Sequence, residues 1–162
     1  MILKSITQAL EEPIDTLQNQ KNSNKELIQW IPEYSIGNIE MDEQHKALFV
    51  MINDFFHQDS KKTVIATFQN LSTYIDLHFE AEERLLRQIN YPKTDEHIKK
   101  HNELRDKFHL LEQKLDNYTI DLHHKISIFL YKWLSSHILK ADMDYKFYAL
   151  SIEERSFSQY DI

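Results

Sequence analysis

The stretch that decides the fold is residues 61–89, KKTVIATFQNLSTYIDLHFEAEERLLRQI. Its inward-facing residues recur at alternating intervals of four and three, a period that keeps one face of an α-helix turned toward neighbouring helices. These positions are Val64, Phe68, Leu71, Ile75, His78, Glu82, Leu85 and Ile89. Tyr91-Pro92 follows, and proline cannot continue a helix. The pattern predicts one long helix over residues 61–87 that packs inside a helical bundle.

Three further segments carry helical patterns, over residues 41–57, 94–116 and 120–141 or beyond. Long helices joined by short connections pack antiparallel to their neighbours. The chain is therefore predicted to be all-α, an up-down-up-down four-helix bundle over residues 28–162. Residues 1–27 would form an N-terminal extension, in which a loose apolar spacing could make a short amphipathic helix.

The composition supports a helical fold and excludes several classes of protein. A chain of 162 residues, 41% apolar, has room for one globular domain. It has no Cys, so any metal must be held by nitrogen and oxygen atoms. The single Gly excludes a Gly-rich phosphate loop. The net charge is -7 and no cluster of Lys and Arg residues stands out, so the charges do not indicate nucleic-acid binding.

The ends of the chain carry no export signal that we recognise. The first ten residues, MILKSITQAL, are only partly apolar, and Glu11, Glu12 and Pro13 follow them. No apolar run approaches the roughly 20 residues that span a bilayer. We expect a cytoplasmic protein with neither nucleic acid nor a membrane as its partner.

Histidines and carboxylates interrupt the apolar faces of the predicted helices. Two pairs lie four residues apart, which aims both side chains of a pair at one point: His78 with Glu82, and His97 with His101. His45 and His137 stand on the apolar faces of the first and fourth helices. Buried polar groups need hydrogen-bond partners or a metal. One such pair alone most often marks a solvated helix face, but together these residues indicate a metal site.

The motifs that contain these residues resemble those of the hemerythrin family. The family's pattern is D-x-Q-H-K-x-L-F, then H-F-x-x-E-E, then H-x-x-x-H, then H-x-x-x-x-D-x-x-Y. This chain has DEQHKALF at 42–49, HFEAEE at 78–83, HIKKH at 97–101 and HILKADMDY at 137–145. The resemblance covers about residues 28–150.

The resemblance implies a centre of two non-haem iron ions, bridged by oxide or hydroxide, inside the bundle. One iron would be held by His97, His101 and His137, and the other by His45 and His78. Glu82 and Asp142 would bridge the two ions. The donors of this set complete the coordination of the first iron and leave one coordination position open on the second. In the family, O2 binds reversibly at that position. The resemblance thus implies an oxygen-binding protein for storage, transport or scavenging, and not an enzyme.

The ligand set also favours oxygen carriage on chemical grounds. Di-iron oxidases in helical bundles use oxygen-rich ligand sets, which favour higher oxidation states. Five neutral imidazoles and two carboxylates would instead stabilise the ferrous pair. Four apolar residues stand next to the ligands and are candidates for an O2 pocket, although ordinary core residues would stand there too: Leu48, Phe79, Trp133 and Ile138.

Helical periodicity alone does not choose Asp142 as a ligand. Asp142 lies five residues after His137, about 140° around an ideal helix, whereas Asp144 would return to the same face. The family pattern, including Tyr145, indicates Asp142. A π-helical widening near Lys140 would reconcile the two, and we predict one.

Three other functions fit parts of the same pattern. The protein could be a sensor of O2, NO or redox state that acts through residues 1–27. It could be a ferroxidase or peroxidase that uses the same irons on ferrous iron or peroxide. It could also hold zinc or another divalent ion, since metal supply decides occupancy as much as the ligands do.

The remaining polar residues are predicted to face solvent. Four histidines lack the spacing of a ligand and are expected on the surface: His57, His109, His123 and His124. In the acidic run of Glu80, Glu82 and Glu83, only Glu82 falls on the inward face.

Overall fold

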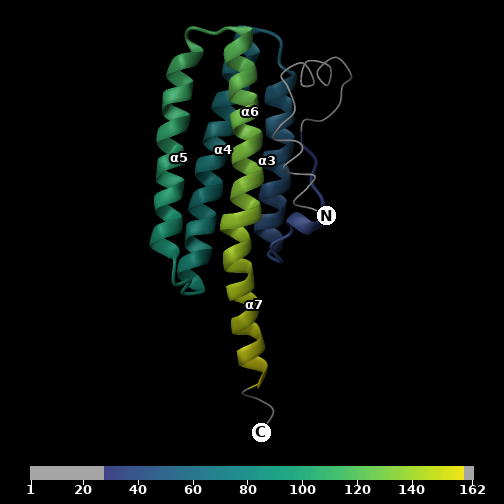
Figure 1. Cartoon of the computed structure of the whole chain (residues 1–162), viewed down its shortest axis with the longest axis vertical. Coiled ribbons are helices and arrows are strands. Elements are labelled where there is room, and N and C mark those ends of the chain that lie inside the picture. Colours follow the sequence, from purple (N-terminus) through teal and green to yellow (C-terminus); the bar gives the residue numbers. More distant parts are fainter. Residues whose placement is uncertain (1–27, 159–162) are drawn as a thin grey trace.

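The computed structural model describes residues 28–158, so the amphipathic segment predicted within 1–27 lies outside the described residues. Four long helices lie side by side in it (Figure 1): α3 (Ile39–His57), α4 (Lys61–Gln88), α5 (Thr94–Leu115) and α6 (Ile120–Ser136). Short connections reverse the chain between successive helices, and the described part of the chain contains no strand. The predicted all-α four-helix bundle is confirmed.

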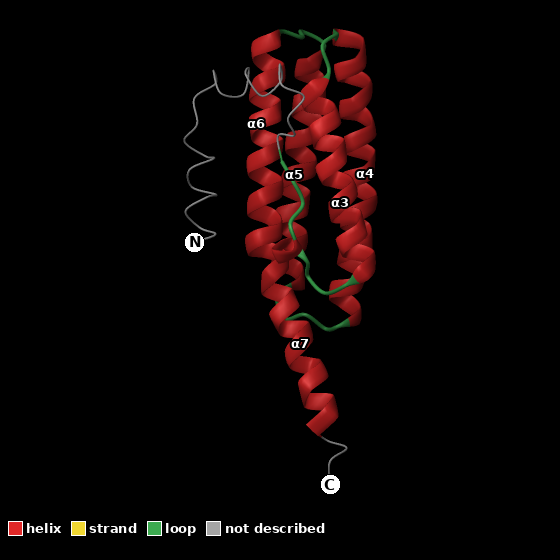
Figure 2. Cartoon of the chain, turned by 90° about the vertical axis from the view of Figure 1, so that its right-hand side faces the viewer, coloured by secondary structure: helices red, strands yellow, loops and turns green. Residues whose placement is uncertain are grey.

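The last helix of the bundle does not stop where α6 ends. It continues through η2 (His137–Asp142), a π-helical segment, into α7 (Met143–Ser158). Figure 2 shows α7 projecting beyond the ends of the other helices. At the other end of the described chain, a short 3-10 helix, η1 (Pro32–Tyr34), precedes α3.

Local sequence signals set the helix boundaries. Asn38, Ser60 and Thr119 precede three of the helices, and each side chain accepts a hydrogen bond from a backbone N–H in the first turn. At the end of α4, Asn90 takes a left-handed conformation with φ of 52°, and the Tyr91 N–H donates to the carbonyl oxygen of Leu86 at 2.9 Å. The helix thus ends just before Pro92, as predicted.

The apolar faces meet in a core that fills most of the bundle. Phe68 of α4 stacks on Phe108 of α5 with ring centroids 5.3 Å apart. Near the end of α4 the buried position is Leu86, while Leu85 and Ile89, which the sequence pattern placed inward, are only partly buried. An α-helix has 3.6 residues per turn, so a strict repeat of four and three drifts off the inner face over several turns.

Some of the buried polar residues lie between two apolar clusters. The larger cluster includes Leu48, Ile75 and Phe79, and the smaller one includes Met41 and Tyr145. On α3, His45 falls between Met41 and Leu48, and on α4, Glu82 falls between Phe79 and Leu86, so members of both clusters flank these polar residues. Within residues 28–158, none of the helices is long and apolar enough to cross a bilayer.

Candidate metal centre

The π-helical segment decides which aspartate faces the interior. It spans His137–Asp142 and adds one residue to the helical turn there. As a result Asp142 is fully buried, whereas the Asp144 side chain is 59% exposed. The predicted widening is confirmed, and the residue that simple periodicity would have chosen points to solvent.

The structure brings all seven predicted ligand residues into one buried layer. Two groups offer ligand atoms that lie within 4.8 Å of one another: Glu82 with His97, His101 and His137, and Glu82 with His45 and His78. In the first group, Oε2 of Glu82 lies 3.0 Å from His101 Nε2 and 3.2 Å from His97 Nε2. Glu82 belongs to both groups, which is the placement a bridging carboxylate requires.

Asp142 also lies between the two groups of histidines. Its Oδ2 atom is 3.2 Å from Nε2 of His45, and its Oδ1 atom is 3.2 Å from Nε2 of His137. Each carboxylate oxygen therefore faces a different group. The arrangement could hold two cations, with two imidazoles on one side, three on the other, and two carboxylates shared.

Unsatisfied polar atoms converge on this layer. Six buried atoms of the predicted ligands find no hydrogen-bond partner among the described residues: both ring nitrogens of His45, Nε2 of His78, Oε1 of Glu82, and both carboxylate oxygens of Asp142. Buried polar atoms without partners are rare and costly. Imidazole nitrogens and carboxylate oxygens are the donors that iron and zinc accept, so the residues fit such a metal.

Neighbouring side chains fix the orientation of two of the histidines. His78 donates its Nδ1–H to Oε1 of Gln44 at 2.9 Å, and His101 donates its Nδ1–H to Oε1 of Glu83 at 3.1 Å. Since the proton is on Nδ1 in each ring, the Nε2 lone pair is available to a metal. Arg105 in turn donates to Oε1 of Glu83 at 3.1 Å and holds that carboxylate in place.

Two buried carboxylates lie among five imidazoles in this layer, and burial and hydrogen bonds shift the pKa values of several of these groups. Burial, together with the nearby Glu82 charge, raises the pKa of Asp142 well above its usual range. Burial alone would also raise the pKa of Glu82, but hydrogen bonds with the histidines hold it well below its usual range. Burial lowers the pKa of His78 to about 3, so this imidazole stays neutral at physiological pH.

The four residues predicted to line an O2 pocket lie in or against the larger apolar cluster. Leu48, Phe79 and Ile138 are fully buried, and Trp133 is partly buried. Phe79 stacks on the His101 ring with centroids 3.7 Å apart, and Trp133 packs against His137 at 5.8 Å. These two aromatic residues therefore contact the group with three histidines.

Three of the residues predicted to face solvent are buried, so those predictions were wrong. His123 is fully buried and donates from Nε2 to the carbonyl oxygen of Phe55 at 2.8 Å, and His124 is 7% exposed. His123 lies on the same inward face of α6 as Ser127 and Leu130, so helical periodicity could have indicated that it is buried. Glu83 is 8% exposed because His101 and Arg105 cover it.

The other two histidines differ from each other. His109 is exposed, as predicted, and accepts a hydrogen bond from the Gln113 amide at 3.0 Å. His57 is only partly buried at the end of α3, where its ring packs on Phe56.

Sequence reasoning did not identify the residues that support the ligands. Gln44 directly precedes His45, and Arg105 follows His101 by four residues, so both stand in or beside the ligand motifs. Neither position shows by itself that Gln44 contacts His78 or that Arg105 contacts Glu83. Trp30 is a further case, because its ring lies 6.3 Å from the His45 ring on the side with two histidines.

Comparison with known proteins gives the class of this bundle. The family model described as "Hemerythrin HHE cation binding domain" matches residues 37–148. This range contains all seven candidate ligands, and the chain belongs to the hemerythrin family.

Individual relatives match most of the chain. A hemerythrin-like protein of Naegleria gruberi is 32% identical over 117 residues, which cover 72% of this chain and 89% of the relative. A bacteriohemerythrin of Clostridium acetobutylicum is 27% identical and is covered to 96% of its length. A myohemerythrin of Riftia pachyptila is 28% identical and is covered to 89%.

Proposed function

We propose that this protein binds O2 reversibly at a centre of two non-haem iron ions, for storage, transport or scavenging of oxygen, and that it is not an enzyme. The observation that carries this proposal is the donor set: five imidazoles and only two carboxylates, both of which lie between the two groups of histidines. Such a set favours the ferrous state and hence release of the bound gas. When bound, the iron pair would supply the electrons that O2 takes up and returns.

The two groups of histidines have different roles in this proposal. His97, His101 and His137 would hold one iron and His45 and His78 the other, with Glu82 and Asp142 shared. The side with two histidines has one protein donor fewer, so O2 would bind there.

The surrounding side chains would keep the site dry. Leu48, Phe79, Trp133 and Ile138 would exclude water, together with Trp30 beside His45. An apolar surrounding slows loss of the reduced state to solvent. Gln44 and Glu83 would hold the histidine rings so that Nε2 points inward.

The test is an optical spectrum of the iron-loaded, anaerobically reduced protein before and after air is added, with iron counted per chain. We expect a new visible ligand-to-metal band at two irons per chain that disappears under vacuum. A band that never forms, or that decays at once to the ferric spectrum, would reject carriage and favour a sensor or an enzyme.

Variants on one helix test the assignment of the bridging residue. Glu82→Gln should lower the iron content well below two per chain, because it removes a charge that both groups share. Glu80→Gln is the matched control, since Glu80 lies on the exposed face of α4. Full iron content in the Glu82 variant would count against its bridging role.

A further inference from the structure

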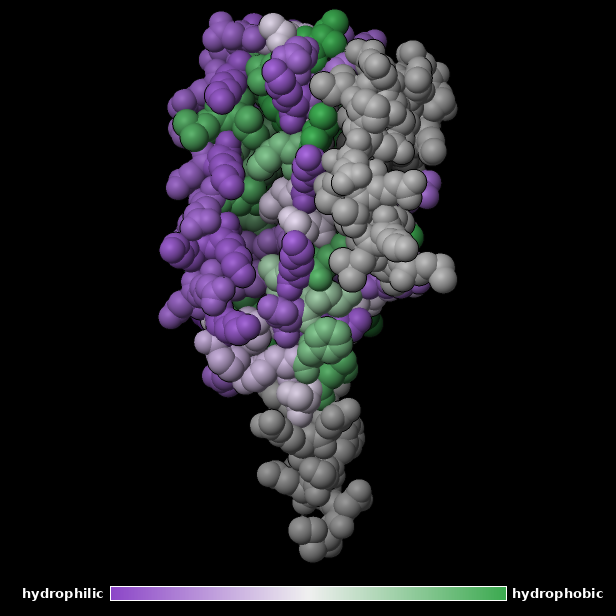
Figure 3. Space-filling view, viewed as in Figure 1, coloured by the Kyte–Doolittle hydropathy of each residue, from purple (hydrophilic) through white to green (hydrophobic). Residues whose placement is uncertain are grey.

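A pocket of about 370 Å³ opens between α5 and the continuous helix of α6, η2 and α7. Its volume falls in the range of sites that bind small molecules. The face drawn in Figure 3 shows hydrophilic side chains over much of these helices, with hydrophobic atoms between them. The pocket is separate from the O2 side of the centre, because its lining includes His137, which belongs to the group with three histidines.

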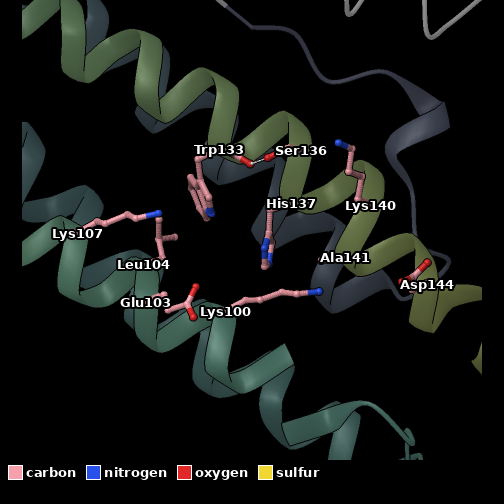
Figure 4. A pocket seen from close by; sticks show the side chains of 10 residues that line it. All are labelled: Lys100, Glu103, Leu104, Lys107, Trp133, Ser136, His137, Lys140, Ala141 and Asp144. Carbon is pink, nitrogen blue, oxygen red and sulfur yellow. Dashed lines mark hydrogen bonds between the residues drawn. The ribbon is translucent and has the colours of Figure 1, made fainter. Parts of the chain in front are cut away.

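Lysines dominate the rim of this pocket. Lys100 and Lys107 come from α5, and Lys140 comes from η2 (Figure 4). Lys100 is 3.4 Å from Glu96, but Lys107 and Lys140 form no ion pair with the other described residues. Two carboxylates, Glu103 and Asp144, also line the pocket. Asp144 lies 4.0 Å from the Lys93 ammonium, so two lining lysines and one lining carboxylate, Glu103, have no ion pair with the described residues. This leaves a local excess of positive charge on a chain whose net charge is -7.

A candidate metal ligand lines the inner wall of the pocket. His137 is 8% exposed, the highest value among the seven candidate ligands. Its Nε2 atom faces the centre, 3.3 Å from Nε2 of His101. Among the described residues this is the one hydrogen bond of the His137 ring, so the other ring nitrogen, Nδ1, has no acceptor there. His137 therefore has a hydrogen-bond donor to offer and lines a pocket with a positively charged rim.

In two other candidate ligands, His78 and His101, the Nδ1–H group has a hydrogen-bond acceptor within the chain. The Nδ1–H groups of His78 and His101 each meet an acceptor oxygen supplied by the chain, from Gln44 and Glu83. Metal-bound histidines almost always donate this second N–H to an acceptor, which orients the ring and strengthens it as a ligand. For Nδ1 of His137 the described residues supply no such hydrogen bond, although three lysines and two carboxylates line the pocket beside it.

We propose that the pocket rimmed by Lys100, Lys107 and Lys140 binds a small oxyanion, whose oxygen accepts a hydrogen bond from Nδ1 of His137. The lysines attract and hold the anion. The anion accepts the Nδ1–H of His137, as Glu83 accepts that of His101. A negatively charged acceptor makes the imidazole a stronger donor and so stabilises the oxidised metal. Anion binding would thereby lower the reduction potential of the centre. This consequence rests on the proposed function, whereas the binding itself does not.

The test measures the binding of inorganic phosphate to the metal-loaded, full-length protein by calorimetry at constant ionic strength. We expect one saturable site per chain. The double variant Lys107→Gln/Lys140→Gln should bind phosphate about tenfold more weakly or worse, since each lost charge removes a charge-assisted contact. Lys99→Gln is the matched control, because Lys99 is exposed on α5 but does not line the pocket. Repeating the titration with acetate separates a carboxylate ligand from phosphate.

The outcomes are distinct from those of the O2 experiment. Saturable binding of either anion that depends on the two lysines, with a lower reduction potential on binding, supports the proposal. No saturable binding of either anion, or equal binding by the double variant and the control, overturns it. Lysine-dependent binding in a protein without a reversible O2 spectrum would reject carriage and leave the anion site intact.

Discussion

Removing the metal should destabilise the bundle by an amount that the buried polar atoms of the centre determine. Six of these atoms find no hydrogen-bond partner among the described residues. An unsatisfied buried polar atom costs about 1–3 kcal/mol, so six would cost about 6–18 kcal/mol. That cost is comparable to the whole net stability of a typical domain. Protonation and trapped water would recover part of it, so we expect a loss of about 5 kcal/mol.

The assay is thermal unfolding followed by circular dichroism, before chelation, after chelation and after iron is returned. For a domain of this size each kcal/mol shifts the melting temperature by about 2–4 °C, so chelation should lower it by about 10–20 °C. Restored iron should restore the melting temperature. A melting temperature that chelation leaves unchanged would refute the reasoning, because the unsatisfied atoms would then not need a metal.

Two aspartates that are two residues apart, Asp142 and Asp144, give a matched pair for the same assay. Asp142→Asn removes a buried carboxylate whose oxygens face both groups of histidines, so most of the metal-dependent stability should disappear. Asp144→Asn changes an exposed side chain and should keep the full effect of chelation. Equal responses of the two variants would show that Asp142 does not contact the metal.

Three further predictions concern pH, ligand support and the core. Burial lowers the pKa of His78 to about 3, against about 6.5 in the unfolded chain, so the unfolded chain binds more protons between these values. The chelated protein should therefore lose up to about 4 kcal/mol as the pH falls from 6.5 to 3, measured by urea unfolding, and His78→Gln should flatten that slope. Glu83→Gln removes the charged acceptor of His101 and should weaken metal binding about tenfold in a chelator competition, while an unchanged affinity would count against its supporting role. Phe68→Ala should cost about 3–5 kcal/mol in urea unfolding, because the ring is fully buried against Phe108, and a loss below about 1 kcal/mol would contradict that packing.

The fold and the candidate ligands could be predicted largely from the sequence because helical periodicity is a local property of the chain. The spacing of Val64, Phe68 and Leu71 identifies the inner face of α4 before any contact is known. The same spacing places His78 and Glu82 on that face. Even the π-helical widening follows from a conflict visible in the sequence, between the family's Asp142 and the ideal turn that would select Asp144.

Only the tertiary structure decided which residues from different helices meet. Gln44 and His78 are 34 positions apart, and His123 reaches the carbonyl of Phe55 across 68 positions. Such contacts depend on how each helix is rotated and offset against its neighbours, and small changes in either exchange one polar partner for another. The separation of α5 from α6 at the lysine pocket is set in the same way. The sequence by itself determined the helices and the residues on their inner faces, whereas the packing of the helices determined the partners of each ligand and the pocket beside His137.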